Sequence, residues 1–525
     1  MRSRLSPAKA CIILFFAAVL AAGLFTFDDH GISGDEIVNR NNGIVARGYA
    51  FGGDEDLLSS RDRHYGTFFE IPLVILEKAF ALSDVREIFL FRHLATFLLY
   101  YAGIVFFYLA GKRIYGGVFI PLLGCVFFVL SPRIFSHAFY NSKDIAFMVF
   151  YIISTYTLLV FLEKRSIMRG IFHALSCAAL IDVRVAGIAV PAMTVLLYAL
   201  FCVTKKEPSR CGWRGVAAYL AMLPAFTVLF WPLLWNSPVK GMAEAFRQMA
   251  RFPWKDNVLY LGSYVPAPAL PWHYAPVWIL ITTPVMYSVL FFTGLLDNMS
   301  ALRGGAAGYL RSRQGQFAAV LLFFAPLCTV ISGGSVLYDG WRHMFFIYPA
   351  FLLVALSGVS AIKDRISSIS LPAAKNAAGF LCILVLAGAL VLTGSGMVRM
   401  HPYQNVYFNV LAGNRENIRN NFEVDYWGLS YAEALRYIAS ADERQRISVY
   451  ISSLPGRIGS IPAFMLEKGE RERFVFTDDP GQADYFVTNY RWHREDYPFD
   501  DEVYSITVDG MKILSVFKLS QDEGA

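Results

Sequence analysis

Residues 9–36 read KACIILFFAAVLAAGLFTFDDHGISGDE. The first part, residues 9–27, is an apolar run long enough to cross roughly 30 Å of hydrocarbon as a helix. Its start is basic, as in a signal peptide, but its apolar core is long and residues 25–28 make a poor cleavage site. We therefore predict a retained membrane helix, followed closely by two adjacent carboxylates, Asp35 and Glu36, at the membrane surface.

The composition of the whole chain indicates a polytopic membrane protein. Hydrophobic residues make up 56% and charged residues only 17%, whereas soluble domains carry about a quarter charged residues. The net charge of +6 comes from short basic clusters between apolar runs, where Lys and Arg report orientation, so we predict no nucleic-acid partner. The cysteines lie in or beside apolar runs, and their spacing indicates neither a disulfide framework nor a CxxC metal site.

Apolar runs recur along the chain and predict about eleven transmembrane helices. One run, 170–181, is short. The predicted crossings are 9–27, 88–110, 118–136, 145–162, 170–181, 186–203, 215–235, 274–295, 316–332, 343–360 and 376–397.

The alternation of basic loops predicts the orientation, because cytoplasmic loops carry an excess of Lys and Arg. With the N-terminus inside, every inside loop is basic, and the short crossing 170–181 is needed to keep this agreement. The C-terminal part then lies outside. The inside set is Arg2, Arg4, Lys9, Lys112, Arg113, Lys164, Arg165, Arg169, Lys205, Lys206, Arg210, Arg214, Arg303, Arg311, Arg313, Lys363, Arg365 and Lys375.

Two domains are expected. Residues 1–398 would form the transmembrane core, with an outer loop, 28–87, that carries amphipathic segments near 35–50 and 66–80 along the interface. Residues 399–525 are polar enough for a soluble α/β domain outside the membrane. Its predicted elements are helices near 431–438 and 461–468, strands near 447–451, 474–477 and 485–488, and a hairpin turning at Asp509-Gly510.

Polar residues gather at the predicted outer face, at the level of Asp35. Such residues are expensive near lipid and therefore tend to be functional or paired. Basic groups that face two carboxylates suit a substrate that carries a phosphate and a hydroxyl. The candidate phosphate-binding residues are Lys143, Arg184, Arg342, Arg92, His93 and His64, and the supporting residues are Asp144, Asp182, Asp339 and His343.

Structural interpretations of the same residues stay open. Ser33 and Glu36 have the spacing of a capping box that starts a surface helix. Lys143 and Asp144 occupy the first turn of a helix capped by Asn141 or Ser142. Asp182 with Arg184 has the spacing of an internal ion pair, and Asp339, Arg342 and His343 that of a structural cluster. His401, Asp425 and Trp427 are expected to seat the soluble domain on the core.

The Asp35-Glu36 pair, the tract Arg61-Asp62-Arg63-His64-Tyr65-Gly66, the triplet Phe91-Arg92-His93 and the multi-span core resemble the C-type glycosyltransferases. Within these the chain is most similar to family 39, the protein O-mannosyltransferases and related bacterial enzymes that use a polyprenyl-phosphate sugar. Residues 131–133, 141–144 and 337–349 resemble a bacterial branch of that group.

The resemblance implies a function and a set of roles. Asp35 would be the general base, and Glu36 would help to position a substrate. The relatives that modify lipid A carry a Lys-Pro-Pro tract where this chain reads His64-Tyr65-Gly66, so that Lys143, Arg184 or Arg342 would supply the positive charge instead. The location implied is the bacterial inner membrane, with the N-terminus cytoplasmic and the C-terminal domain periplasmic or extracellular.

The expected reaction is inverting transfer of a sugar from a polyprenyl-phosphate donor to a hydroxyl of a protein, lipid or envelope glycan. No general acid is needed, since the lipid phosphate is a good leaving group. We expect no metal site and no obligatory cofactor, although Asp35 and Glu36 together could bind a divalent cation with the substrate phosphate. Two rival interpretations are a transporter or lipid flippase and a non-catalytic subunit of a cell-envelope assembly.

Overall fold

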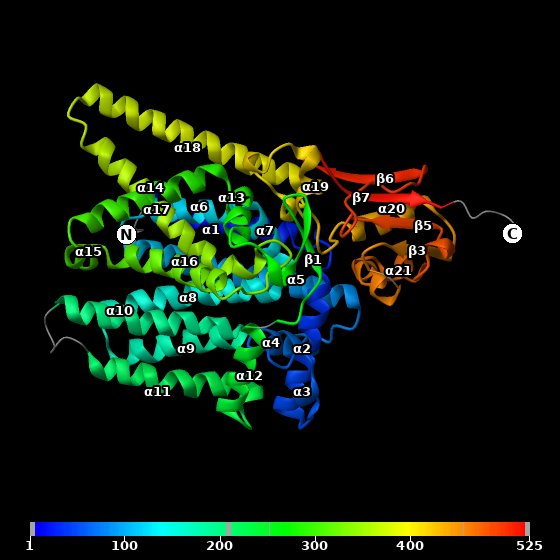
Figure 1. Cartoon of the computed structure of the whole chain (residues 1–525), viewed down its shortest axis with the longest axis horizontal. Coiled ribbons are helices and arrows are strands. Elements are labelled where there is room, and N and C mark those ends of the chain that lie inside the picture. Colours follow the sequence, from blue (N-terminus) through cyan, green and yellow to red (C-terminus); the bar gives the residue numbers. More distant parts are fainter. Residues whose placement is uncertain (1–5, 206–211, 251, 455, 520–525) are drawn as a thin grey trace, which may run out of the picture.

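The computed structural model describes residues 6–205, 212–250, 252–454 and 456–519, and consists of a bundle of long helices with a small β-sheet at one end (Figure 1). We call this end of the bundle the sheet end. Nine helices in the described residues are long and apolar enough to cross a membrane, or ten if the bent pair of α6 and α7 counts as one span. The long helices are α1 (Pro7–Thr26), α5 (Val85–Tyr115), α8 (Ser142–Glu163), α10 (Ala189–Lys205), α11 (Trp213–Phe230), α14 (Val285–Arg303), α16 (Gln314–Ser332), α17 (Tyr348–Ser367) and α18 (Pro372–Met400).

These helices confirm the predicted membrane fold, with two differences. The run 118–136 is not straight: α6 (Phe119–Val129) and α7 (Pro132–Tyr140) meet at 68°. The run 274–295 is broken into α13 (Tyr274–Thr282) and α14 just before Val285. A proline, Pro132 or Pro284, lies at each break, and proline removes a backbone donor and restricts the residue before it. The short run 170–181 lies on α9 (Ile167–Val183), a helix of 17 residues.

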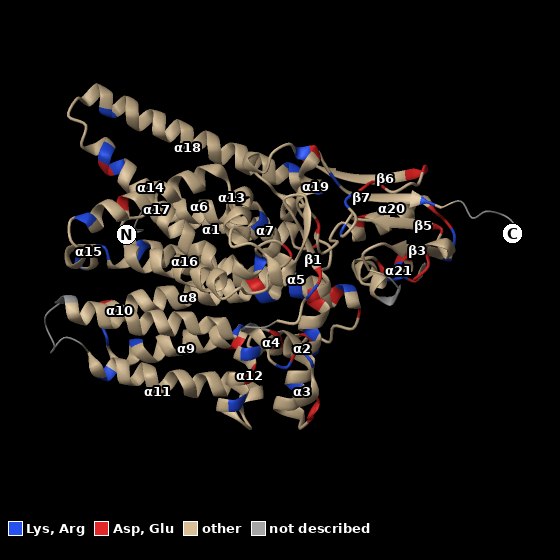
Figure 2. Cartoon of the chain, in the orientation of Figure 1, with Lys and Arg blue, Asp and Glu red and all other residues tan. Residues whose placement is uncertain are grey.

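Charged residues concentrate at the two ends of the bundle (Figure 2). Lys and Arg mark the ends of α11, α14 and α17 that lie away from the sheet, in agreement with the predicted basic loops. Four residues of the predicted inside set, Arg2, Arg4, Lys206 and Arg210, lie outside the described residues.

Three helices of the first polar loop, α2 (Gly34–Gly52), α3 (Asp56–Ser59) and α4 (Glu70–Ala79), lie at the sheet end. An ion network ties them to the bundle. Arg92 on α5 pairs with Glu70 and Glu77 of α4, and Glu77 also pairs with Arg40 of α2 at 2.9 Å. Ser142 at the start of α8 donates to Glu70 at 2.7 Å. The loop helices are therefore fixed against the core by buried polar contacts.

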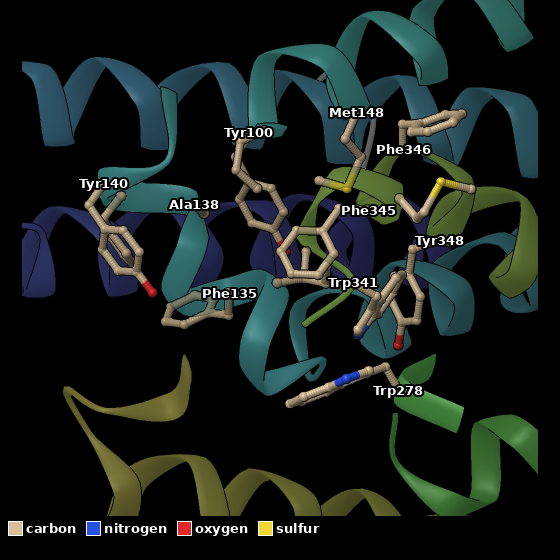
Figure 3. Close-up of a cluster of buried hydrophobic side chains, with 14 of the residues drawn as sticks. Tyr100, Phe135, Ala138, Tyr140, Met148, Trp278, Trp341, Phe345, Phe346 and Tyr348 are labelled. Carbon is tan, nitrogen blue, oxygen red and sulfur yellow. The ribbon is translucent and has the colours of Figure 1, made fainter. Parts of the chain in front are cut away.

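An aromatic core supports the beginning of α17 (Figure 3). The preceding 3-10 turn, Arg342–Ile347, carries Phe346, whose ring lies 4.8 Å from Phe147 of α8. The Trp341 indole donates to Thr282 at 2.8 Å, and its ring contacts Phe345 at 4.8 Å. The backbone on both sides of Arg342 is thus held by buried rings.

The chain beyond α18 forms the sheet and its cover. A five-stranded sheet has the order β4-β3-β5-β7-β6, in which β3 is parallel to β4 and β5, and β7 is antiparallel to β5 and β6. The Asp509-Gly510 turn joins β6 to β7, as predicted, with positive φ at both residues. The elements are α19 (Ile418–Asn421), α20 (Tyr431–Ala441), β3 (Ile447–Ile451), α21 (Lys468–Arg471), β4 (Phe474–Phe476), β5 (Tyr485–Thr488), β6 (Glu502–Val508) and β7 (Met511–Lys518).

One predicted helix of this region is wrong. Residues 461–468 form a 3-10 turn, Pro462–Met465, and an extended residue, Glu467, before the short α21. The apolar residues there are buried, so their pattern reflects packing under α20 and not a helical face. The remaining elements near the bundle are α12 (Pro238–Ala250), the hairpin of β1 (Asn257–Tyr260) and β2 (Ser263–Pro266), and α15 (Ala306–Ser312).

Candidate active site

The start of α2 fixes Asp35 at the sheet end. Ser33 and Glu36 form the predicted capping box, in which the Glu36 carboxylate accepts from the Ser33 backbone at 2.8 Å. Asp35 lies in the first turn, where the helix dipole stabilises an anion. Its side chain is 42% exposed, whereas that of Glu36 is 3% exposed. Of the two carboxylates, Asp35 is the accessible one.

Arg342 joins three carboxylates from different parts of the chain. Its guanidinium lies 3.3 Å from Asp35, 3.1 Å from Asp144 and 3.0 Å from Asp339. Arg184 pairs with the other oxygen of Asp144. Asp144 and Asp339 balance the formal charges of Arg184 and Arg342, and Asp35 adds a third carboxylate at the accessible end of the cluster.

A first cavity, of about 240 Å³, opens beside Asp35 and is basic at one end. We call it the basic cavity. Lys143, Arg184, Arg342 and His343 line it. Lys143 lies over the Tyr65 ring, 3.4 Å from its centroid, and makes no ion pair with any described residue. Apolar side chains complete the lining: Phe147, Ala186, Met249, Val330, Val336, Leu337, Met344 and Phe346.

A second cavity, of about 450 Å³, extends from Asp35 toward the sheet. We call it the polar cavity. The two cavities share Asp35, Asp62, Tyr338 and Arg342 among their walls. The C-terminal region closes the polar cavity with Trp427, Ser453, Leu454, Arg491 and Trp492.

Arg491 links this closing wall to the cluster. Its guanidinium donates to Asp339 at 2.7 Å, on the carboxylate oxygen that Arg342 does not use. The Arg342 guanidinium lies between two rings, 5.1 Å from the centroid of Tyr338 and 4.9 Å from that of Trp427. Aromatic faces of this kind hold a guanidinium in place.

The predicted site residues divide into two groups. The residues that line one or both cavities are Asp35, Lys143, Arg184, Arg342, His343 and Asp339. Asp144 lines neither cavity but pairs with Arg184 and Arg342, which do. The others do not line either cavity: Glu36, Arg92, His93, His64 and Asp182.

Three residues of the second group have structural partners: Glu36, His93 and Arg92. His93 lies 3.0 Å from Glu36, and Arg92 belongs to the network that holds α4. Asp182 does not pair with Arg184, which uses Asp144 instead; the buried Asp182 packs against the backbone at Gly66. Burial lowers the pKa of His64, which favours its neutral form and weakens the case for phosphate binding there.

Two buried acidic groups with raised pKa values, Glu423 and Tyr338, lie at or beside the polar cavity. Glu423 is buried, and neither carboxylate oxygen has a hydrogen-bond partner among the described residues. Burial raises the pKa of Glu423 to about 8, against the opposing effect of the Arg491 charge. Burial also raises the pKa of Tyr338 to about 12, which keeps the phenol neutral between the two cavities. Burial thus favours the protonated form of both groups.

No family model and no curated protein matches the chain. Among solved structures, ArnT from Cupriavidus metallidurans bound to undecaprenyl phosphate aligns over 97% of this chain and 98% of its own, with 15% identity and a TM-score of 0.50. The chain has the GT-C fold. The apo form of the same ArnT aligns with a TM-score of 0.49 at 14% identity over 97% of this chain and 98% of its own. The archaeal oligosaccharyltransferase AglB from Archaeoglobus fulgidus aligns over 90% of this chain and 69% of its own, with 11% identity and a TM-score of 0.46.

On this GT-C fold, several lining residues escaped the sequence analysis. Arg491 and Trp492 reach the polar cavity from a loop beyond the last apolar run, and Trp254 reaches it from the loop between the runs 215–235 and 274–295. The only sequence signal is the basic and aromatic tract Arg491-Trp492-His493-Arg494, directly after β5. Among the described residues, no group of three or more His, Cys, Asp or Glu side chains could hold a metal ion. A divalent cation at Asp35 therefore stays a prediction.

Proposed function

We propose that the protein is an inverting glycosyltransferase that moves a sugar from a polyprenyl-phosphate donor to the hydroxyl of an acceptor. The observation that carries this proposal is the position of Asp35, which lies where a basic, partly apolar cavity meets a polar one. A lipid phosphate suits the first cavity, and a hydroxyl acceptor suits the second. The shared fold with a protein that binds undecaprenyl phosphate supports a donor of this class.

In the proposed reaction, Asp35 takes the proton of the acceptor hydroxyl as its oxygen attacks the anomeric carbon. The bond between that carbon and the phosphate oxygen breaks, and its electron pair leaves with the polyprenyl phosphate. A single displacement of this kind inverts the anomeric centre. Asp35 is exposed enough to reach an acceptor and close enough to Arg342 to be held in one orientation.

The cations of the basic cavity stabilise the departing phosphate. Arg342 and Arg184 are already placed by Asp144, so they need little reorganisation when charge develops on the leaving group. Lys143 adds a charge that no carboxylate neutralises. These three cations would neutralise the charge of the departing phosphate, as a metal ion does in other sites that act on phosphates. We therefore propose a reaction without an obligatory metal.

The decisive experiment compares the purified protein with its Asp35→Asn variant in lipid, using radiolabelled polyprenyl-phosphate sugars. Asp35→Asn removes the base, and we expect transfer to fall about 10²–10⁴-fold, the usual contribution of general-base catalysis. Asp56→Asn on α3 is the matched control, since Asp56 is an exposed carboxylate at the same end and lines neither cavity.

Full transfer by Asp35→Asn would refute the assigned base. Lipid movement without sugar transfer by the wild type would favour the flippase, and neither activity would favour the assembly subunit. The predicted setting for the reaction is the outer side of a bacterial inner membrane, with the acceptor hydroxyl on a protein, a lipid or an envelope glycan.

A further inference from the structure

Three tryptophans line the polar cavity, and each comes from a different part of the chain. Trp254 follows α12, Trp427 precedes α20, and Trp492 follows β5. Trp427 is buried against Arg342, and Trp254 stacks on Tyr338 with ring centroids 4.3 Å apart. Trp492 is 47% exposed. The cavity thus combines fixed aromatic walls with one ring that is open to a ligand.

The segment that presents Trp492 is held in an unfavourable backbone conformation. Tyr490 has φ of 60° and Trp492 has φ of 62°, in the left-handed region that bulky residues rarely adopt. Such outliers persist only where surrounding contacts hold them, and they cluster at ligand sites. Arg491 provides such a contact, because it pairs with Asp339 and lies 4.5 Å from the Trp492 ring centroid.

The polar lining of this cavity combines four carboxylates with three arginines, Arg61, Arg342 and Arg491. Asp35, Asp62, Asp256 and Asp339 line it, and a carboxylate accepts but does not donate. Asp62 and Asp256 form no ion pair with any described residue, so they are available to a ligand. Hydroxyl donors match this arrangement.

The same wall disfavours other acceptors. Arg342 and Arg491 are already paired with carboxylates, so Arg61 is the remaining arginine of the lining, and an acceptor that carries several phosphates would face more acidic groups than basic ones. An extended peptide gains much of its affinity by adding to the edge of a sheet, yet none of the lining residues belongs to a strand. The aromatic faces and carboxylates of the polar cavity instead fit a sugar ring, which has C–H faces and hydroxyl groups at its edges.

We propose that the polar cavity binds a neutral carbohydrate acceptor, with Trp492 as a specificity-determining platform for its sugar ring. This inference rests on the proposed function. One hydroxyl of the bound sugar would lose its proton to Asp35 and form the new glycosidic bond as the polyprenyl phosphate leaves. Asp62 and Asp256 would accept hydrogen bonds from other hydroxyls of the same acceptor.

The test uses a panel of acceptors with one polyprenyl-phosphate sugar donor. The panel contains neutral hexose and N-acetylhexosamine oligosaccharides of a few units, Ser/Thr peptides and lipid-linked hydroxyl acceptors. Release of polyprenyl phosphate is followed together with labelled product, so that donor cleavage is scored even where no acceptor works. Asp35→Asn provides the baseline for both readouts.

Trp492→Gly isolates the platform. Glycine is at ease at positive φ, so the substitution removes the ring and relieves the backbone without adding strain. We expect the KM for the oligosaccharide acceptor to rise roughly ten- to hundredfold, because loss of the aromatic contact and its buried area weakens binding by about one to two factors of ten. The donor KM should stay the same, and Trp492→Phe should restore most of the loss. Trp272→Ala, which removes another exposed indole outside both cavities, is the control.

The outcomes separate the inference from the proposed function. Asp35-dependent transfer only to peptides or lipid acceptors would overturn the carbohydrate assignment and leave the transferase intact. An unchanged acceptor KM in Trp492→Gly would overturn the platform. Absence of Asp35-dependent donor cleavage with the whole panel and with water would overturn the proposed function itself, and the inference with it.

Discussion

Of Lys143, Arg184 and Arg342, Lys143 is the one that forms no ion pair with a described residue. Arg184 and Arg342 share Asp144, so truncating either would remove a buried ion pair and destabilise the fold. Lys143 contacts the Tyr65 ring instead. Its substitution therefore reports on function more cleanly than that of either arginine.

We expect Lys143→Gln to raise the donor KM and lower kcat, by roughly tenfold each, because a charge-assisted contact to phosphate contributes about 1.5–3 kcal/mol. Lys143→Arg should recover part of the loss, since it keeps the charge but not the compact ammonium. Initial-rate kinetics with the labelled donor would measure both parameters. Lys78→Gln, an exposed lysine on α4, is the control, and a wild-type donor KM in Lys143→Gln would contradict the assignment.

Glu423 predicts how stability depends on pH. Its pKa is raised to about 8 in the folded state, so the folded chain binds the proton more tightly than the unfolded chain. The stability it contributes is complete below the unfolded value near 4.5 and is lost as pH rises through about 8. The loss is at most about 1.4 kcal/mol per pH unit across that window.

Glu423→Gln should remove this part of the pH dependence, because the amide stays neutral. Thermal unfolding midpoints in detergent between pH 5 and 9 would show the variant equal to the wild type at low pH and more stable at high pH. Asp425, whose pKa is also raised by burial, would leave a residual slope of the same sign. Parallel curves for the two proteins would show that Glu423 ionises normally.

At the scale of the elements, the contact between the first polar loop and α9 deserves a direct test. A Cβ at Gly66 would overlap the carbonyl oxygen of Asp182, at the end of α9. Gly66→Ala should therefore push residues 61–66 away from the bundle and lower the free energy of unfolding by about 1–3 kcal/mol. Transfer should fall too, because Asp62 and Tyr65 line the cavities.

Denaturation curves and transfer rates would measure both effects. Gly34→Ala is the matched control, because a Cβ there meets no atom within 4 Å, although it lies next to Asp35. Equal behaviour of the two variants would show that the segment tolerates displacement from α9.

The helix ends also explain how much of the site the sequence could predict. Polar residues beside apolar runs share one membrane level, which is why Lys143, Arg184 and Arg342 could be grouped with Asp35. The same criterion selected Arg92 and His93, which pair with Glu70, Glu77 and Glu36 inside the fold. Hydropathy indicates how deep in the membrane a residue lies but not which residue it contacts. The criterion therefore could not separate ligand-binding residues from residues that form structural ion pairs.

On the scale of the whole molecule, the membrane core was predictable and the junction with the sheet was not. Each of the eleven predicted apolar runs coincides with a helix or a broken pair of helices, because a single apolar segment in lipid can satisfy its backbone hydrogen bonds only as a helix. Arg491 and Trp492 reach the site by tertiary packing of a region without a membrane to restrict it. Their contribution depends on how the sheet docks, and neither periodicity nor composition encodes that position.

The common wall of the two cavities has a consequence for turnover. An apolar lining favours entry and exit through lipid, and a polar lining favours exchange with water. In the proposed reaction, donor and acceptor therefore would not compete for one cavity, and either could bind first. The spent carrier could diffuse sideways into the bilayer while the elongated product departs into the aqueous phase, so that a catalytic cycle would not have to wait for the molecule to open.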